Sequence, residues 1–475
     1  MPTKIFFATP PISMEERYGS LAGAGSSLPT LGILYLAAMT REKGFPTALC
    51  DAAARSFSAA HLLEKVLAER PDVLGLSATT FSVFHAAAFA ALVKRQLPEL
   101  KVVIGGPHVS AAPLETMARF PEFDLAVIGE GEETIIDLLE AIQGGQPCDG
   151  IAGIVFRKGE ELVATGRRPF LKELDTLPRP AWDLLDGFPQ AYLPAPFKVR
   201  KTPAASLVTS RGCPNSCIFC DRSVFGTSCH AFSADYVVAT IRYLADSFGV
   251  REFSFEDDTF ISFKKRLKDI CQMIIDLKLD ISWTCLGRVT SVDAETLALM
   301  KRAGCWQISF GIESGCPEIL KTIHKNVTLE QIERAVCLCH DAGILSKGFF
   351  IVGHPGETRE TLQRTLDFAL RLPLDDISAT MLTPFPGTEI YERAAEFGTF
   401  DSDWSRMNLL NTVFVPHGLT QEFIEQFQRD MLRRFYLRPR IVLGYIRRLL
   451  TNPSMARGLL LGARAFFRST AGSNG

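Results

Sequence analysis

The sequence predicts an α/β protein in which a doubly wound, flavodoxin- or Rossmann-like domain precedes a partial barrel of six βα units and a helical C-terminal tail. Two observations support this fold. Short apolar segments alternate with amphipathic segments over residues 1–145 and again over 201–400, which is typical of parallel strands joined by helices. Residues 146–200 interrupt the pattern and are dotted with prolines. We therefore predict domains at 1–145 and 201–400, a linker at 146–200 and a tail at 401–475.

Composition limits the class of protein. The chain has 475 residues, 47% apolar and 22% charged, with a formal net charge of -2. These values are typical of a globular protein with more than one domain, and the charge argues against a nucleic-acid binder. No apolar run is long enough to span a bilayer, and the N-terminus reads as a first strand rather than a signal peptide. We expect a cytoplasmic protein whose cysteines stay reduced.

In the first domain, the polar and glycine-rich loops follow the strands. Near-continuous apolar strands are expected at 4–8, 47–50, 73–77, 102–105 and 125–128, with helices near 31–43, 61–70, 83–97 and 133–142. Doubly wound sheets bind ligands beyond the carboxyl ends of their strands. The loops there, at 77–80, 105–108 and 129–132, offer close backbone approach and hydroxyls, although ordinary turns are an alternative. No G-x-G-x-x-G follows the first strand, so a nicotinamide or flavin site is disfavoured, while a phosphate-binding or sensor domain stays an alternative.

The second series begins after a hairpin at 153–164 and the proline-rich passage. Strands are expected near 205–209, 252–256, 281–285, 306–311, 348–352 and 377–382, separated by amphipathic helices. The working residues of βα barrels lie at the carboxyl ends of the strands. At those ends lie adjacent carboxylates (Asp257 and Asp258), then Arg288, then Glu313 and Ser314. Each has a purely structural alternative: a surface acidic cluster for the two aspartates, a salt bridge inside the barrel for Arg288 and a helix cap for Glu313.

The strongest motif is Cys213-x3-Cys217-x2-Cys220, directly after the first barrel strand. A loop this short can bring three thiolates to three corners of an iron–sulfur cube and leave the fourth iron without a protein ligand. A zinc site completed by Cys229 and His230 is the rival, and three unmodified buried thiols are a second alternative. Zinc sites usually present C-x2-C or H-x3-H pairs, and no such second pair follows.

This motif, with an aromatic residue (Phe219) before its last cysteine, resembles that of the radical SAM superfamily. The resemblance implies a [4Fe–4S] cluster on the three cysteines, with S-adenosylmethionine chelating the fourth iron. It also implies contacts to S-adenosylmethionine from Phe219, Asp257, Asp258, Arg288, Glu313, Ser314 and Phe349.

The first domain resembles the cobalamin-binding domain found ahead of many radical SAM domains. The resemblance rests on segments 28–32, 71–77, 105–108 and 129–132 together with Asp51. No D-x-H-x-x-G loop is present, which implies cobalamin bound without a protein histidine on cobalt, and we expect a loop or corrin-edge role for His108. The cobalamin contacts that the resemblance implies are Thr30, Leu31, Ser77, Thr79, Gly105, Gly106, His108, Gly129, Glu130 and Gly131.

The tail is basic and apolar. From Arg429 to Gly475 there are ten arginines, one acid and no lysine, interleaved with large apolar residues. Amphipathic basic helices of this kind usually pack on the neighbouring domain, and the alternative is peripheral contact with an anionic membrane.

Together the resemblances imply a cobalamin-dependent radical SAM methyltransferase acting on an unactivated carbon. A 5′-deoxyadenosyl radical would abstract hydrogen from the substrate, which would then take a methyl group from methylcobalamin. One alternative is a cyclase or rearrangement enzyme with the same cofactors and no net methylation. Another is a cobalamin- or redox-responsive binding protein with a structural cluster. We expect a small-molecule or biosynthetic-intermediate substrate and an electron donor such as flavodoxin or ferredoxin.

Overall fold

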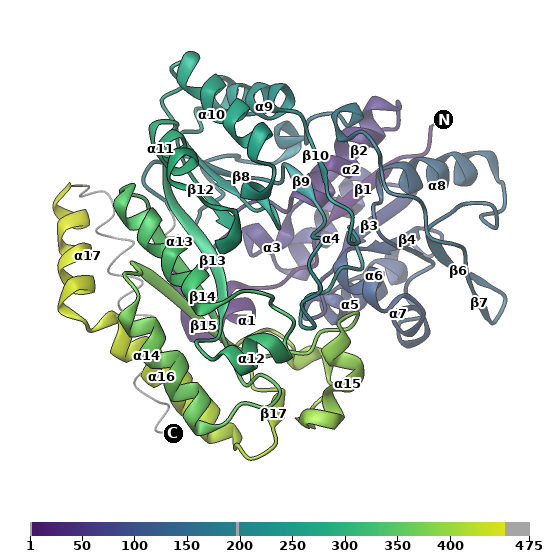
Figure 1. Cartoon of the computed structure of the whole chain (residues 1–475). Coiled ribbons are helices and arrows are strands. Elements are labelled where there is room, and N and C mark those ends of the chain that lie inside the picture. The colour runs from purple at the N-terminus through teal and green to yellow at the C-terminus, as the bar shows by residue number, and fades with distance from the viewer. Residues whose placement is uncertain (1, 196–198, 452–475) are drawn as a thin grey trace.

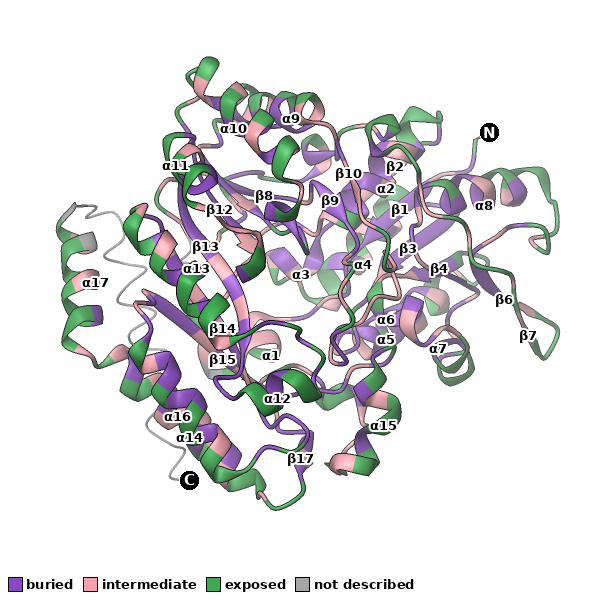
Figure 2. Cartoon of the chain, in the orientation of Figure 1, coloured by how far each residue is buried: buried purple, intermediate pink, exposed green. Residues whose placement is uncertain are grey.

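Two β-sheets organise the chain, one in each half of the sequence (Figure 1). The computed structural model describes residues 2–195 and 199–451. The strands of both sheets are buried over most of their length, whereas the helices around them keep exposed outer faces (Figure 2). The predicted fold, an α/β domain followed by a parallel βα array and C-terminal helices, is confirmed.

The first sheet has seven strands in the order β2-β1-β3-β4-β5-β6-β7. Strands β1 to β5 are parallel, and the order reverses beside β1, as in doubly wound sheets. The last two strands form an antiparallel hairpin that pairs with β5. The strands are β1 (Ile5–Ala8), β2 (Thr47–Cys50), β3 (Val73–Ser77), β4 (Lys101–Gly105), β5 (Leu125–Val127), β6 (Ile154–Lys158) and β7 (Glu161–Ala164).

Helices cover both faces of this sheet. Apolar side chains of α2 and α8 pack on one face, and those of α4 and α5 pack on the other. Serine and aspartate side chains cap α3 and α4 at their first turns, which explains why these helices begin where they do. The helices are α1 (Met14–Tyr18), α2 (Leu31–Glu42), α3 (Ala52–Arg55), α4 (Ala59–Glu69), α5 (Val83–Gln96), α6 (Pro107–Ala111), α7 (Pro113–Arg119) and α8 (Glu132–Gly144), with a 3-10 turn at Gly19–Ala24.

The hairpin at 154–164 belongs to the first sheet rather than to a free linker, because β6 pairs with β5. Its apolar residues extend the sheet's buried face, which a proline-rich tether could not do. Two short 3-10 turns follow, at Leu174–Thr176 and Trp182–Leu184. We infer that the domain junction lies after this hairpin, between residues 165 and 203.

The second sheet is an open, all-parallel array in the order β15-β14-β13-β12-β11-β8. Neighbours in space are neighbours in sequence, which is the arrangement of a partial βα barrel. The strands are β8 (Ala204–Leu207), β11 (Glu252–Phe255), β12 (Ser282–Gly287), β13 (Cys305–Glu313), β14 (Leu345–Val352) and β15 (Asp376–Met381). The first strand ends at Leu207, two residues earlier than expected, and residues 210–211 pair with a separate short strand. That ribbon consists of β9 (Ser210–Arg211) and β10 (His230–Ala231).

Amphipathic helices line the outside of the barrel, and their apolar faces share one core with its strands. They are α9 (Ala234–Phe248), α10 (Lys264–Asp276), α11 (Ala294–Arg302), α12 (Pro317–Thr322), α13 (Leu329–Asp341), α14 (Arg359–Arg371) and α15 (Glu389–Phe397). Further 3-10 turns lie at Phe260–Ser262, Val289–Ser291 and Trp404–Arg406, and a two-stranded ribbon joins β16 (Gly398–Phe400) to β17 (Phe414–Pro416).

The C-terminal region packs against both domains. Trp404, Met407 and Val413 pack into the core of the first domain, although they lie near the end of the chain. Helix α16 (Gln421–Tyr436) buries its apolar face against the barrel beside β15, and α17 (Pro439–Thr451) follows it. Part of the basic tail, residues 452–475, lies outside the described residues. Among the helices of residues 2–195 and 199–451, none combines the length and apolar character needed to cross a membrane.

Candidate active site

The cysteine loop connects β9 to β10 and is held at several backbone positions. Gly212 has φ +85°, and a Cβ there would lie 2.1 Å from the Ser228 carbonyl oxygen, so only glycine fits at this position. The Ile218 amide donates to the Ile323 carbonyl at 3.3 Å, and the Ile390 amide donates to the Ile218 carbonyl at 3.1 Å. The loop is therefore fixed against elements from the second half of the barrel.

The thiols of this loop are suited to binding iron. A hydrogen bond with the Cys220 thiol lowers the pKa of Cys217 to about 6, with further help from Lys325 and Arg288. The same hydrogen bond raises the pKa of Cys220, and Asn215 Nδ2 donates to Cys213 Sγ at 3.2 Å. Over the described residues, no three His, Cys, Asp or Glu side chains converge on one metal ion. A cubane instead binds each thiolate through a different iron, so this donor set fits an iron–sulfur cluster.

The two adjacent aspartates have different environments. Asp257 is buried, and its Oδ1 accepts hydrogen bonds from the Thr209 amide (3.1 Å), Thr209 Oγ1 (2.8 Å) and Ser210 Oγ (2.5 Å). Burial raises the pKa of Asp257, and Arg266 lies 4.0 Å away. This carboxylate secures the turn that leads into the cysteine loop. Its other oxygen has no hydrogen-bond partner among the described residues.

Asp258 remains exposed beside the same loop. Although the residue is exposed, neighbouring protein atoms partly desolvate its carboxyl and raise the pKa of Asp258, while a hydrogen bond with the Gly212 backbone works in the opposite direction. Because its side chain reaches the surface next to Cys213, Asp258 is better placed than Asp257 to meet a ligand amine. The roles predicted for both aspartates toward S-adenosylmethionine stay predictions.

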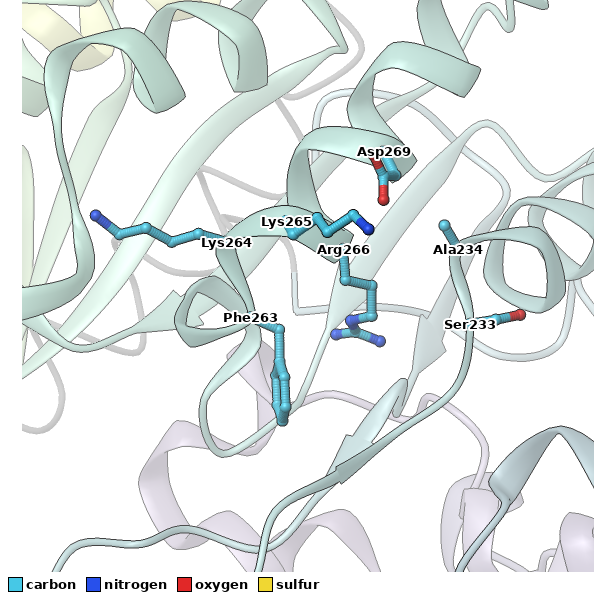
Figure 3. A pocket seen from close by; sticks show the side chains of 7 residues that line it. All are labelled: Ser233, Ala234, Phe263, Lys264, Lys265, Arg266 and Asp269. Carbon is cyan, nitrogen blue, oxygen red and sulfur yellow. The ribbon is translucent and has the colours of Figure 1, made fainter.

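Arg266, which supports Asp257, also lines an open surface pocket of about 510 Å³ at the start of α10 (Figure 3). The other lining side chains are those of Ser233, Ala234, Phe263, Lys264, Lys265 and Asp269. None of the predicted site residues lines this pocket. Arg266 Nη1 donates to the Thr209 carbonyl at 2.7 Å, so the residue supports the strand end from behind.

A buried ion pair faces the cysteine loop from β13. Glu313 occupies a bulge with φ +66°, and its Oε1 lies 2.7 Å from Lys325 Nζ. Burial alone would lower the pKa of Lys325, but Glu313 outweighs it and raises that pKa. The Lys325 ammonium also lies 5.9 Å from the centroid of the Phe219 ring. Arg288 donates to the Lys325 carbonyl oxygen, so the structure brings three predicted residues together around this lysine.

Two other predicted residues have different neighbours. Ser314 is fully buried, and its hydroxyl lies 3.0 Å from Thr365 Oγ1 on α14. Phe349 is half-buried on β14, with Lys347 Nζ 5.8 Å from its ring centroid. Along β14 half-buried residues alternate with buried ones, as expected for a strand with one face on a barrel interior and one on the helices. Contact of Ser314 and Phe349 with S-adenosylmethionine stays a prediction.

The loop after β14 buries two titratable side chains. His354 is fully buried with its ring 5.8 Å from that of Phe219, and neither of its ring nitrogens has a hydrogen-bond partner among the described residues. Burial lowers the pKa of His354 to about 3. Glu357 Oε2 accepts hydrogen bonds from the amides of Gly353 (2.6 Å) and His354 (3.0 Å), and Thr358 caps α14.

The predicted cobalamin loops meet at the carboxyl ends of three neighbouring strands, β3, β4 and β5. Ser77, Gly105 and Gly129 are partly exposed there, and Thr79 is exposed. Gly106 has φ +100°, and a Cβ would lie 2.7 Å from the Ala78 carbonyl oxygen, so the loop requires glycine. This glycine-containing, partly exposed edge allows the backbone to approach a bulky ligand closely.

Thr30 and Leu31 begin α2 beside the same edge. The buried carboxylate of Asp51 accepts hydrogen bonds from the Thr30 amide (2.7 Å) and Thr9 Oγ1 (2.8 Å), and it also caps α3. Asp51 thus ties the loops after β1 and β2 to the start of α2.

His108 lies in the interior rather than at the loop surface. Its Nδ1 is 3.2 Å from Thr80 Oγ1, and its ring packs edge-on against Trp404 at 4.4 Å. Burial, with Arg119 nearby, lowers the pKa of His108 to about 4, so the imidazole is neutral. These contacts explain His108 as part of the packing between α6 and the C-terminal region, and its corrin-edge role stays a prediction.

Glu130 joins the first domain to the cysteine loop. Its Oε1 lies 2.6 Å from Arg211 Nη1, and its Oε2 accepts a hydrogen bond from the Leu171 amide at 2.8 Å. Both carboxylate oxygens therefore have a partner within the protein, and the cobalamin contact expected of Glu130 stays a prediction. Gly131, which follows, lies against Leu36 of α2, and its cobalamin contact also stays a prediction.

The geometry defines a class of protein. A three-thiolate loop at the mouth of an open parallel βα array faces the ligand-binding edge of a doubly wound domain, and a buried ion pair joins the two. Such an arrangement can hold two cofactors next to each other.

Comparisons with known proteins agree with this class. Residues 207–369 match the model of the radical SAM superfamily, and residues 20–139 match that of the B12 binding domain. An uncharacterized methyltransferase of Pyrococcus horikoshii is 34% identical over 421 residues, covering 88% of this chain and 90% of that protein. The anaerobic magnesium-protoporphyrin IX monomethyl ester cyclase of Rubrivivax gelatinosus is 26% identical, covering 93% of this chain and 79% of that protein.

A solved structure shows the same fold. The cobalamin-dependent S-adenosylmethionine radical enzyme OxsB, with aqua-cobalamin and S-adenosylmethionine bound, has a TM-score of 0.72 at 19% identity, covering 90% of this chain and 65% of that one. The chain belongs to the radical SAM superfamily and carries an N-terminal B12 binding domain. Its cofactors are a [4Fe–4S] cluster, S-adenosylmethionine and cobalamin.

Sequence reasoning missed Arg211, Lys325 and His354. Arg211 stands two positions before Cys213, and that nearness was the only available signal. Lys325 lies in the segment after α12, and the sequence shows His354 only as one residue of the loop after the fifth barrel strand. Their positions depend on contacts between distant segments.

We expect replacement of Cys213, Cys217 or Cys220 by alanine to abolish cluster binding, since each thiolate holds its own iron. The measurement is iron and sulfide per chain after anaerobic reconstitution. Cys337→Ala is the matched control, because that cysteine is exposed on α13. Full cluster content in the triplet variants would contradict the assignment.

Burial raises the pKa of Glu357 to about 8 in the folded protein, against 4.5 for the free side chain. Its stabilising contribution is therefore complete below the lower value and is lost as the pH rises through the higher one. We expect Glu357→Gln, which keeps the acceptor oxygen, to lose less unfolding free energy than the parent protein between about pH 5 and pH 8. Denaturant titrations at the two pH values measure this, with exposed Glu360→Gln as the control. If the unfolding free energy of the parent protein and that of Glu357→Gln changed equally with pH, the raised pKa of Glu357 would be refuted.

Proposed function

We propose that this protein is a cobalamin-dependent radical SAM methyltransferase that methylates an unactivated carbon of a small molecule. The observation that carries the proposal is the buried contact between Arg211, at the start of the cysteine loop, and the strand-end loop of the B12 binding domain, because the two loops predicted to hold the cofactors meet there. The Pyrococcus horikoshii relative, described as a methyltransferase, supports the choice of reaction.

Each part of the site has a task in this reaction. When bound, the cluster with S-adenosylmethionine supplies radical chemistry, and cobalamin supplies a methyl group. Cys213, Cys217 and Cys220 hold the cluster, while exposed Asp258 can accept hydrogen bonds from a ligand ammonium. Lys325, fixed by Glu313, presents a positive charge toward the thiolates. The half-buried face of β14 gives the barrel a partly apolar lining that keeps water from the reacting carbon.

A cyclase or rearrangement enzyme with the same cofactors is the second candidate. It is favoured by the likeness to the Rubrivivax gelatinosus cyclase, which extends over 93% of this chain. The two candidates differ in the product, because methylation adds one methyl unit to the substrate and cyclisation does not.

We expect the reconstituted protein, incubated with S-adenosylmethionine, hydroxocobalamin and a low-potential reductant, to release 5′-deoxyadenosine and to add a methyl unit from S-adenosylmethionine to a component of a cell extract. Reduced flavodoxin or ferredoxin should replace the chemical reductant if either is the electron donor. Mass spectrometry with methyl-deuterated S-adenosylmethionine measures both products. Cys217→Ala serves as the inactive control. A product of unchanged or lower mass would favour the cyclase, and neither 5′-deoxyadenosine nor a labelled product would favour a binding protein.

We also propose peripheral contact between α17 and an anionic membrane. Ile441 of this helix is buried against the barrel, but Leu443, Ile446 and Leu450 are 64%, 49% and 77% exposed. An exposed apolar face on a helix of a basic segment suits the interface of an anionic bilayer.

We expect the double variant Leu443→Ser, Leu450→Ser to lose cosedimentation with anionic liposomes, while the parent protein pellets with them. Leu277→Ser is the matched control, because Leu277 is 45% exposed at the end of α10, away from α17. A parent protein that stays in the supernatant would disprove membrane contact.

A further inference from the structure

The B12 binding domain and the radical SAM domain are joined by a buried triad of charges. Arg211 Nη1 lies 2.6 Å from Glu130 Oε1, and Arg211 Nη2 lies 2.5 Å from Glu132 Oε1. All three side chains are buried, with exposures of 4%, 6% and 7% for Arg211, Glu130 and Glu132. Each carboxylate binds a different terminal nitrogen of the planar guanidinium. The two contacts therefore fix the orientation of the Arg211 guanidinium as well as its distance from the two glutamates.

Aromatic rings from both domains enclose the guanidinium. Tyr35 of α2 lies 5.5 Å from it, and Phe225, within the cysteine loop and after its three cysteines, lies 5.3 Å from it. Tyr35 also stacks on Phe232 of the barrel domain at 6.0 Å. The arginine is therefore held in place by contacts on its edge and on its faces.

Stability alone does not explain this arrangement. The triad carries a net charge of one negative unit in the interior, where desolvation offsets much of the attraction between the charges. Apolar residues of similar volume commonly give equal or higher stability. The best-attested benefit of buried ionic groups is instead that they fix how two segments align with each other.

The triad connects the two cofactor loops. Arg211 stands directly before Gly212 and Cys213, and the two glutamates follow Gly129 at the end of β5, on the predicted cobalamin edge. A Cβ on Gly129 would lie 3.6 Å from the Val224 carbonyl oxygen, which follows the three cysteines within the cysteine loop. The loop of the first domain thus approaches the chain on both sides of the cysteine triplet.

We propose that Arg211 is a positioning residue that fixes the cluster loop relative to the cobalamin loop and so sets the distance between the two cofactors. The inference rests on the proposed function and adds how that function depends on the domain junction. Arg211 touches neither reacting group, and it acts through the backbone of Gly212 and Cys213. A displacement of about 1 Å between reacting centres can lower a rate on the order of 100-fold, so a rigid junction matters for turnover.

The test measures the distance between the cofactors directly. In the reduced holoenzyme, cob(II)alamin and the cluster are both paramagnetic, and pulsed EPR records how strongly the cluster speeds the relaxation of the cobalamin spin. The variants are Arg211→Lys, which keeps the charge but loses the fork, and the neutral triple Arg211→Met, Glu130→Gln, Glu132→Gln. The triple removes every charge at once, so that no unpaired ion is left to unfold the protein.

The matched control is Arg168→Met. Arg168 lies 3.2 Å from Glu133 and also pairs with Asp137. Both acids are on α8, which begins at Glu132, but these pairs are partly exposed and involve no residue of the cysteine loop. Iron and cobalamin content and the melting temperature are measured for every variant.

We expect Arg211→Lys and the neutral triple to keep both cofactors but to show altered relaxation of cob(II)alamin and more 5′-deoxyadenosine per methylated product, with KM for S-adenosylmethionine unchanged. Arg168→Met should match the parent protein. If both variants fold and show the cob(II)alamin relaxation and the ratio of 5′-deoxyadenosine to methylated product of the parent protein, the inference about Arg211 is wrong. The proposed function would not be affected by that result. A parent protein that bound neither cofactor would overturn the proposed function, and the inference with it.

Discussion

Parallel strand pairing is the constraint on which the rest of the structure depends. Because β1 to β5 run the same way, the loops that follow them emerge at one edge, and the same holds for the six strands of the barrel. Each sheet can therefore gather residues from distant parts of the chain at a single ligand-binding edge. The loops predicted to hold the two cofactors come together where these edges meet, and neither sheet carries both sets of loops alone.

The sequence was sufficient for features that depend on short spacing or on regular patterns. The triplet Cys213, Cys217 and Cys220 is recognisable because its loop is local, and alternation of apolar strands with amphipathic helices predicts both sheets. Residues such as Thr358 mark helix starts through contacts within one turn. These features depend on residues close together in the sequence, so they can be predicted without knowing which distant segments they contact.

Other features depend on contacts that no local pattern records. Arg211 meets Glu130 across 81 positions of the sequence, and Trp404 reaches His108 from near the other end of the chain. Asp257 and Asp258 look equivalent in the sequence, but burial commits one to the fold and leaves the other at the surface. The hairpin at 154–164 was assigned to the linker because pairing with β5 cannot be read from its own residues.

The packing of Trp404, Met407 and Val413 in the first domain has a consequence for how this protein is assembled. The B12 binding domain is completed by residues that leave the ribosome after the whole barrel has been synthesised. The first domain therefore shares part of its apolar core with the end of the chain, and a fragment that ended before the barrel would lack these three core residues.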